Sequence, residues 1–312
     1  MYDSNQEYDV VIIGGGPAGL SAGLYTSRAR LNSLLIERGI IGGQITNTEQ
    51  VDNYPGFPEG IGGIELTQLM HRQAEKHGMK FTTSEVTGIE IKAKQKVVKT
   101  TNGDLTARAV IIANGAERQK LGIPGEEEFN GRGVSYCATC DAAFFRERTV
   151  AVVGGGDAAI TEALHLSRFA SKVIVIHRRD QLRATVIEQE KAFAEPAIEF
   201  LWDTVVEEIA GEGFVTGLKL RNVTSGQKSA VEVGGIFIAV GFKPNTDYLK
   251  GLLTLTDSGA IITNDRLETS VPGIFAAGDI RQNSIRQVIS AAGDGAVAAI
   301  SADRFIAEYD SD

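Results

Sequence analysis

The stretch VVIIGGGPAG, residues 10–19, decides the fold, because a short apolar strand runs directly into a glycine turn that opens a helix. A second copy, VAVVGGGDAA, covers residues 150–159, at an offset of 140 residues. The same offset relates the strands at residues 34–36 and 174–176. Similarity over a whole strand–helix–strand unit predicts a duplicated architecture with two right-handed βαβ crossovers.

Each crossover is followed by elements of the same kinds. Alternating residues at 81–105 and about 199–233 predict small antiparallel meanders, and Asn102-Gly103 marks a turn in the first. Further buried strands are expected at 109–113, 235–240 and 273–279, and helices at 64–77 and about 287–308. The expected fold class is α/β, with two Rossmann-like three-layer dinucleotide-binding domains, each with a small antiparallel β-meander.

Two segments that carry glycine and proline, 115–125 and 241–246, lie where the composition changes. We interpret them as hinge strands that connect the two domains. One domain, 116–243, is then inserted into another that is built from residues 1–115 and 244–312.

Composition excludes several classes of function. The 312 residues carry a formal net charge of −9, which argues against a nucleic-acid-binding surface. No run of 18 apolar residues is present, so no membrane-spanning helix is expected. Residues 1–9 are polar and acidic and lack the pattern of a secretory signal.

The first glycine fingerprint is Gly14-x-Gly16-x-x-Gly19. Its glycines permit a tight turn, close approach of the backbone to a pyrophosphate, and close packing of helix on sheet. Glu37 ends the second strand, where a carboxylate accepts hydrogen bonds from ribose hydroxyls. This favours a dinucleotide without a 2′-phosphate, with FAD as the candidate; the alternative is a purely structural turn.

A second part of the same domain supports a flavin. Gly278-Asp279 ends a strand, where a carboxylate can hold flavin hydroxyls, and Arg286-Gln287-Val288 opens a helix whose N-terminus favours the negative charge of reduced flavin. The alternative interpretation of Asp279 is a simple helix N-cap.

The second fingerprint, Gly154-x-Gly156-x-x-Ala159, is followed by a strand that ends in basic residues. His177 stands in the register of Glu37; Arg178 and Arg179 follow it, and Arg183 lies one helical turn further. Guanidinium groups form charge-assisted, bidentate bonds with phosphate, so the pattern predicts NADPH over NADH. The alternative is an ordinary solvated run of charges.

The only two cysteines of the chain form the motif Cys137-Ala138-Thr139-Cys140, which Asp141 follows. A C-x-x-C pair beside a dinucleotide site predicts a dithiol/disulfide redox centre. A zinc half-site fails on ligand count, since no second cysteine pair exists and the four histidines form no matching cluster, so no metal is expected. A pair of inert buried thiols is the remaining alternative.

These motifs together resemble low-molecular-weight thioredoxin reductases of the class II pyridine nucleotide-disulfide oxidoreductase family, over nearly the whole chain. Besides the glycine turns, the segments that carry the resemblance are GGQ from 42, VDNYPGFPEG from 51, GIPGEEEFNGRGVSYCATCDAAFF from 122, HRRDQLRA from 177, AVGFKPNT from 239, ETSVPGIFAAGD from 268 and IRQVISAAGDGAVAA from 285. The resemblance implies a homodimeric, cytoplasmic flavoprotein that passes electrons from NADPH through FAD to its own disulfide and then to thioredoxin.

The resemblance also implies roles for single residues. Cys140 would face the flavin, Cys137 would attack the disulfide of thioredoxin, and Asp141 would be the acid–base residue. The FAD contacts would be Gly14, Gly16, Pro17, Ala18, Gly19, Glu37, Arg38, Gly42, Gly43, Gln44, Asn53, Gly115, Gly278, Asp279, Arg286, Gln287 and Val288. The NADPH contacts would be Gly154, Gly156, Asp157, Ala158, Ala159, His177, Arg178, Arg179 and Arg183.

The order of these parts along the chain leads to a hypothesis of motion. The disulfide and the NADPH fingerprint share one domain, yet both must reach a flavin that the other domain holds. We therefore expect the domains to rotate about the two hinges between half-reactions. Two other functions stay open: reduction of a different thioredoxin-like protein by the same chemistry, and a redox-sensing flavoprotein without onward turnover.

Overall fold

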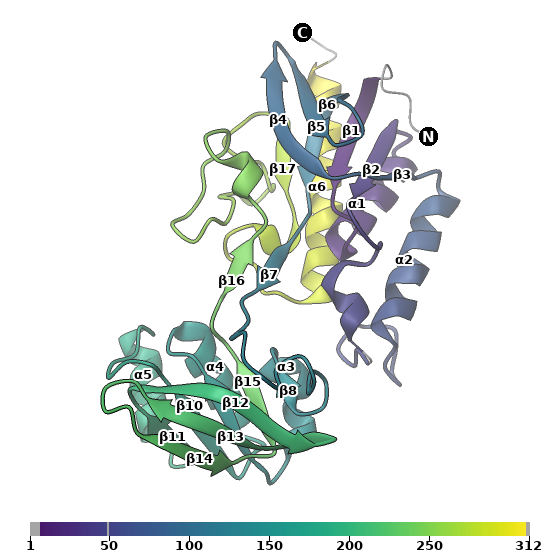
Figure 1. The fold of residues 1–312 in the computed structure, drawn as a ribbon. Helices are drawn as coiled ribbons and strands as arrows, with labels where there is room; N and C mark the ends of the chain where they lie inside the picture. Colours follow the sequence, from purple (N-terminus) through teal and green to yellow (C-terminus); the bar gives the residue numbers. More distant parts are fainter. Residues whose placement is uncertain (1–6, 49, 310–312) are drawn as a thin grey trace. The chain divides into compact units, whose positions relative to one another are not determined.

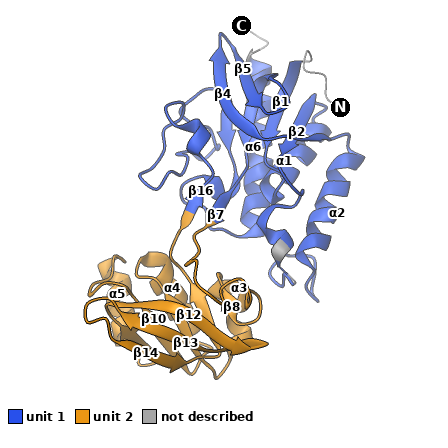
Figure 2. Ribbon diagram, viewed as in Figure 1, with its two compact units in different colours: residues 1–117, 243–312 blue, residues 118–242 orange. Residues whose placement is uncertain are grey.

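The computed structural model describes residues 7–48 and 50–309. It divides into two compact units, shown in Figure 2: unit 1 is Met1–Glu117 with Lys243–Asp312, and unit 2 is Arg118–Phe242. The chain crosses between them in β7 (Ala116–Arg118) and β16 (Phe242–Pro244), which pair as a two-stranded ribbon. These crossings lie within two residues of the boundaries expected from the sequence.

The described residues of unit 1 form a seven-stranded sheet in the order β3-β2-β1-β6-β5-β4. β17 pairs with residues 110–112 of β6, beyond the part of β6 that pairs with β5. Its strands are β1 (Glu7–Ile13), β2 (Ser33–Glu37), β3 (Lys80–Thr83), β4 (Val86–Lys92), β5 (Gln95–Thr100), β6 (Leu105–Ile112) and β17 (Ile274–Ala276). β3, β2, β1, β6 and β17 are parallel neighbours, whereas β4 and β5 pair antiparallel.

Both faces of this sheet are buried, as alternation along β1 shows. Val10 and Ile12 face the helices, where they pack with residues of α1 (Pro17–Arg28) and α6 (Val288–Tyr309). Val11 and Ile13 face a second cluster that includes Leu249 of the short helix η3 (Asp247–Leu249). α2 (Gly63–Lys76) packs beside α1, and Figure 1 shows α1 and α6 running along the sheet.

Unit 2 has three layers. Its parallel sheet runs β11-β10-β9-β15-β8, with helices on one face and an antiparallel three-stranded sheet, β12-β13-β14, on the other. The strands are β8 (Val134–Ser135), β9 (Thr149–Val153), β10 (Lys172–Ile176), β11 (Ile198–Leu201), β12 (Thr204–Glu212), β13 (Phe214–Asn222), β14 (Lys228–Glu232) and β15 (Gly235–Ile238). The helices are α3 (Ala138–Asp141), η2 (Ala142–Phe145), α4 (Asp157–Leu166) and α5 (Val186–Ala194).

The structure corrects the extent of both predicted meanders. β3 and β11, assigned to their first strands, pair parallel with β2 and β10 and extend the central sheets. The antiparallel parts therefore begin only at Val86 and Thr204. An alternating pattern reports a half-buried strand but not the direction of its partner, which explains the error.

Two further expectations differ from the structure. Arg183 does not lie in a helix: its N–H donates to Gly155 O at 2.6 Å, which ties it into a loop, and α5 begins only at Val186. The end of the predicted 115–125 hinge belongs to unit 2, because the buried carboxylate of Glu126 accepts N–H bonds from Leu121 and Gly122 at 3.0 and 2.7 Å. Among the described residues, no helix is long and apolar enough to cross a membrane.

Candidate functional site

The first glycine turn is held by contacts that no side chain could replace. A Cβ on Gly19 would lie 1.8 Å from Gly14 O, so the third glycine is required for the helix to approach the turn. Gly14 adopts a φ of +105° and donates its N–H to Ile36 O at 2.8 Å. Gly15 N–H donates to Glu37 Oε2 at 2.7 Å, so the carboxylate predicted to bind ribose lies directly beneath the turn.

Segments far apart in the sequence meet around this turn. A Cβ on Gly43 would come within 3.0 Å of Gly16 Cα, and a Cβ on Gly278 within 3.0 Å of Ala18 Cβ. Backbone thus approaches backbone around the N-terminus of α1, with little side chain between. The structure therefore brings together the predicted fingerprint, the 42–44 segment and the Gly278 turn.

Other predicted flavin contacts have partners of their own. Asn53 Nδ2 donates to Gln287 Oε1 at 3.0 Å, which joins two predicted residues: Asn53 in the loop before α2 and Gln287 directly before α6. Arg38 forms an exposed ion pair with Glu117 at 2.7 Å, and the Gln44 amide donates to Ala116 O, so both turn toward β7.

The interpretation of Asp279 as a helix N-cap is wrong. Asp279 lies inside the short helix η4 (Gly278–Ile280), whose N-cap is Ala277. Its Oδ1 accepts a bond from Ser284 Oγ at 2.7 Å. This bond holds the carboxylate within the turn that Gly278 brings close to Ala18 of the fingerprint.

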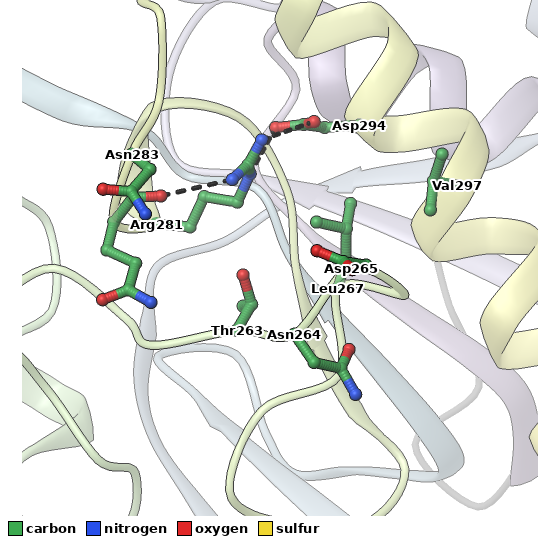
Figure 3. Close-up of a pocket in the computed structure, with 9 residues that line it drawn as sticks. Thr263, Asn264, Asp265, Leu267, Arg281, Asn283, Asp294 and Val297 are labelled. Atoms are coloured by element: carbon green, nitrogen blue, oxygen red, sulfur yellow. Dashed lines mark hydrogen bonds and ion pairs between the residues drawn. The ribbon is translucent and has the colours of Figure 1, made fainter.

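A hollow of about 300 Å³ is lined by residues of the segments 263–267 and 281–283 and by Asp294 and Val297 of α6 (Figure 3). Its walls contain a bidentate ion pair in which Arg281 Nε and a terminal nitrogen meet the Asp294 carboxylate at 2.6 and 2.8 Å. Asp294 Oδ2 also accepts Gly278 N–H at 3.0 Å, so the pair anchors the turn that carries Asp279. Sequence reasoning missed this pair, because residues 13 positions apart form no periodic pattern.

The second glycine turn repeats the backbone hydrogen bond of the first but has a different residue beneath it. Gly154 N–H donates to Ile176 O at 3.1 Å, as Gly14 does to Ile36. The His177 ring occupies the space that a Cβ on Gly155 would need, 2.3 Å from Cε1. Burial lowers the pKa of His177, and the charges of Arg183, Arg179 and Arg178 lower it further against a bond to the Gln181 backbone. The imidazole is therefore neutral near pH 7.

The three arginines around this turn are exposed, and none forms an ion pair with a described carboxylate. Arg183 is fixed by its backbone bond to Gly155, and the neighbouring Thr185 N–H donates to Asp157 Oδ1 at 2.7 Å. The loop 177–185 thus returns to the fingerprint and leaves the three guanidinium groups unpaired beside it, which suits an anionic ligand.

Cys137 and Cys140 form a disulfide with Cα atoms 5.3 Å apart. Cys137 is the N-cap of α3, and Cys140 lies within it; Cys137 is half-buried and Cys140 is exposed. Exposure therefore does not by itself assign the attacking sulfur. No group of three or more potential metal ligands occurs among the described histidine, cysteine, aspartate and glutamate residues.

Asp141 completes the turn that carries the disulfide. Burial raises the pKa of its carboxyl, while a bond from Ser135 Oγ at 2.6 Å and the charge of Arg118 act in the opposite direction. A carboxyl with a raised pKa keeps its proton closer to neutral pH, as a proton donor to thiolates requires. Sequence reasoning missed Ser135, and it missed the exposed side chain of Phe144. For Phe144 the available signal was an aromatic pair, Phe144-Phe145, that begins four residues after Cys140.

Comparison with known proteins shows which family has this fold and these motifs. The family described as pyridine nucleotide-disulphide oxidoreductase matches residues 8–295. The chain belongs to this family. Its curated relatives include the thioredoxin reductase of Bacillus subtilis, which is 50% identical over 302 residues, 96% of this chain and 95% of that protein.

Two solved structures extend the comparison. The thioredoxin reductase of Streptococcus pyogenes is 46% identical, with a TM-score of 0.91 over 97% of this chain and 99% of that one. The thioredoxin reductase of Lactococcus lactis, described as the FR conformation, is 47% identical, with a TM-score of 0.66 over 96% of this chain and 99% of that one. The fold and the resemblance to thioredoxin reductases expected from the sequence are thereby confirmed.

Proposed function

We propose that this chain is an NADPH-dependent thioredoxin-disulfide reductase (EC 1.8.1.9), in which electrons pass from NADPH to FAD, to the Cys137–Cys140 disulfide and on to oxidised thioredoxin. The disulfide loop carries the proposal: it holds a formed bond, an exposed residue at Cys140, and a carboxyl at Asp141 whose pKa burial raises. The names of relatives at 46–50% identity over nearly the whole chain support thioredoxin as the partner.

The residues of unit 1 suit FAD. The close approach of Gly43 to Gly16 leaves a backbone cradle at the N-terminus of α1, which is suited to a pyrophosphate. Glu37 suits an unphosphorylated ribose and would repel a 2′-phosphate. Bound there, FAD supplies a ring that accepts a hydride and passes two electrons to a disulfide.

The residues of unit 2 suit NADPH. Its turn repeats the cradle, but Arg178, Arg179 and Arg183 replace the acidic edge with unpaired guanidinium groups. A neutral, buried His177 adds no negative charge that would oppose a 2′-phosphate. These residues would bind and orient the nucleotide, and their charge accounts for a preference over NADH.

The thiol chemistry follows from the loop. Two electrons, which the FAD would supply, break the Cys137–Cys140 bond and leave two thiolates. The Cys137 thiolate then bonds to one sulfur of the partner's disulfide, whose other sulfur leaves as a thiolate and takes a proton from Asp141. Attack of the Cys140 thiolate on Cys137 re-forms the internal disulfide and releases the second partner thiolate, which takes a proton from solvent. The partner gains two electrons and two protons.

Rotation of the units between half-reactions is part of the proposal. The disulfide and the arginine-bearing turn both belong to unit 2, whereas the flavin cradle belongs to unit 1. Two relatives of 46% and 47% identity have TM-scores of 0.91 and 0.66, a spread that supports more than one arrangement of units within this family. A cross-link that locks the units is expected to stop turnover, and full activity in the locked protein would contradict rotation.

The proposal includes a cytoplasmic homodimer that binds neither nucleic acid nor membrane. The net charge of −9 supports the first of these exclusions. Phe144, 65% exposed and four residues after Cys140, supports a protein rather than a small-molecule partner, because an exposed ring offers apolar contact area.

A turnover assay with purified protein, NADPH and thioredoxin tests the proposed function, with NADH and a second thioredoxin-like protein run alongside. Cys140→Ser is expected to leave flavin reduction by NADPH intact and to abolish reduction of thioredoxin. Cys137→Ser should also abolish reduction of thioredoxin, since both sulfurs are needed to re-form the disulfide. Flavin reduction without onward turnover in the unmodified protein would favour a redox sensor instead.

A further inference from the structure

Ser135 is a buried serine that ends β8, two residues before the disulfide. Its side chain is 4% exposed, and β8 pairs with β15 in register Phe237↔Ser135, which fixes the backbone at this point. Its Oγ donates to Asp141 Oδ2 at 2.6 Å and accepts Cys137 N–H at 3.1 Å. One hydroxyl thus connects the carboxyl to the backbone of the first cysteine.

We propose that Ser135 is a positioning residue that holds the Asp141 carboxyl against the disulfide loop and accommodates it both with and without its proton. This inference rests on the proposed function, in which Asp141 supplies a proton during thiol exchange. It adds a residue that neither the cysteine motif nor the nucleotide fingerprints contain.

Hydrogen-bond counting explains how one hydroxyl serves both states. With Asp141 ionised, the Ser135 proton points to the carboxylate, at the 2.6 Å distance of a charge-assisted bond. With Asp141 protonated, the carboxyl donates instead, and the Ser135 proton turns to Cys137 O, which lies 3.5 Å away. In that state Oγ accepts two bonds and donates one, the full capacity of a hydroxyl.

The charges around Asp141 are few, so the hydroxyl has a large share in its proton affinity. Burial raises the pKa of Asp141, and the opposing influences are the Ser135 bond and then the charge of Arg118 on β7. α4 packs against α3 and carries Asp157, Glu162 and His165, but none of these described groups adds a charge interaction at Asp141. Loss of the Ser135 bond therefore raises the pKa of Asp141 further.

The test is the pH profile of the reaction in Ser135→Ala. A general acid works in its protonated form, so activity falls as pH rises through its pKa. Removal of a bond to the ionised carboxylate should move this fall upward by about one pH unit. The maximal rate with thioredoxin should drop about tenfold, while flavin reduction by NADPH, followed by absorbance, stays as in the unmodified protein.

The control is Ser33→Ala in unit 1. Ser33 is also 4% exposed, and Ser33→Ala also removes a hydroxyl bond, since Ser33 Oγ accepts from Thr26 Oγ1 at 3.0 Å. Ser33 belongs to β2 of unit 1, whereas the disulfide loop belongs to unit 2. It should leave the pH profile unshifted. In an Asp141→Asn background, Ser135→Ala should cause no further shift, because the titrating group is gone.

A readout that does not need turnover separates this inference from the proposed function. The reduced full-length protein is alkylated with iodoacetamide over a range of pH, and Ser135→Ala should displace the Asp141-dependent inflection by about one pH unit. Should the unmodified protein fail to reduce thioredoxin, the proposed function falls and this alkylation profile decides the role of Ser135. Ser135→Thr, which keeps a hydroxyl, should leave the inflection in place, and a displaced inflection in this variant would contradict the inference even if Ser135→Ala does not fold.

Two results would overturn the inference. One is a profile of unchanged shape in Ser135→Ala with a uniformly lower rate, which is the behaviour of a residue that merely supports the loop. The other is an identical shift in Ser33→Ala, which would show that the profile reports general stability.

Discussion

Glu37 and His177 occupy the same place beneath two glycine turns 140 residues apart. Above them the backbone is nearly the same: Gly14 and Gly154 donate to Ile36 O and Ile176 O at 2.8 and 3.1 Å. Glu37 accepts the N–H of Gly15, whereas the His177 ring fills the space beside Gly155 and its Nε2 has no hydrogen-bond partner among the described residues.

In a dinucleotide site of this kind, the backbone and the side chains have separate roles. The turn and the helix N-terminus can receive any pyrophosphate, so duplication preserved them in both units. In the proposed function, the residue beneath the turn and the loop behind it face the ribose end of the dinucleotide, where FAD and NADPH differ, and the two copies have different residues there. An acid in one copy and three unpaired arginines in the other give the two sites opposite charge.

The largest expected effect tests how strictly the two turns correspond. Gly19→Ala places a Cβ 1.8 Å from Gly14 O, so unit 1 should lose more than about 4 kcal/mol in the free energy of unfolding. We expect purified Gly19→Ala to carry no FAD, measured from the flavin absorbance per protein. The reverse change at the matching position, Ala159→Gly, removes only a buried methyl group near the start of a helix and should cost about 1 kcal/mol.

Retention of full FAD by Gly19→Ala would show that the first turn can relax as the second one did. The two turns would then differ by history and not by steric need. Urea unfolding of both variants, followed by far-UV circular dichroism, gives the two free energies on the same scale.

The next effect concerns the basic edge of the second turn. Replacement of Arg178 and Arg179 together by alanine should lower kcat/KM for NADPH at least about a hundredfold, because each guanidinium bond to a phosphate contributes about 1.5–3 kcal/mol. The value for NADH should change little, since it has no 2′-phosphate. Arg168→Ala removes an exposed arginine of the same unit away from the turn and serves as the control. An equal loss of kcat/KM for both nucleotides would mean that the arginines are an ordinary solvated run of charges and do not bind the 2′-phosphate.

How far the sequence could predict this molecule depends on whether a feature is local. Both turns, the disulfide motif and the inserted domain were predictable, because each shows itself within a few consecutive residues or in the repeat offset. The parallel pairing of β3 with β2 was not, since it depends on which strand lies alongside. The Arg281–Asp294 pair was hidden because its members lie on a loop and a helix that only folding brings together.

Ser135 was also not predictable from the sequence, although it is close to its partner along the chain. It stands six residues from Asp141, and their bond forms only because the chain turns at Cys137 into α3. A serine before a C-x-x-C motif has no pattern of its own, whereas the carboxylate after it was found by its adjacency. Positioning residues of this kind are recognised only from distances.

A smaller effect probes the acidic side of the comparison. Glu37→Gln keeps the shape beneath the first turn but weakens the charge-assisted bond to Gly15 N–H, so FAD affinity should fall about tenfold. Fluorescence titration of the apoprotein with FAD measures this. His177→Gln, the corresponding change in unit 2, should leave FAD affinity unaltered; a matching loss there would mean that FAD does not distinguish the two turns.

The smallest effect distinguishes the two residues by their response to pH. Burial lowers the pKa of His177 below its ordinary value, so below about pH 6.5 the unfolded chain binds a proton that the folded chain does not. The free energy of unfolding must then fall as pH drops through this range, by up to about 1.4 kcal/mol per pH unit. Urea unfolding at pH 7.5 and 5.5 should show a smaller loss in His177→Gln than in the unmodified protein. His165→Gln is the variant to compare with His177→Gln, because burial and the charge of Arg168 lower the pKa of His165 as well. An unchanged loss in His177→Gln would mean that the imidazole takes up its proton without leaving its place beneath Gly155.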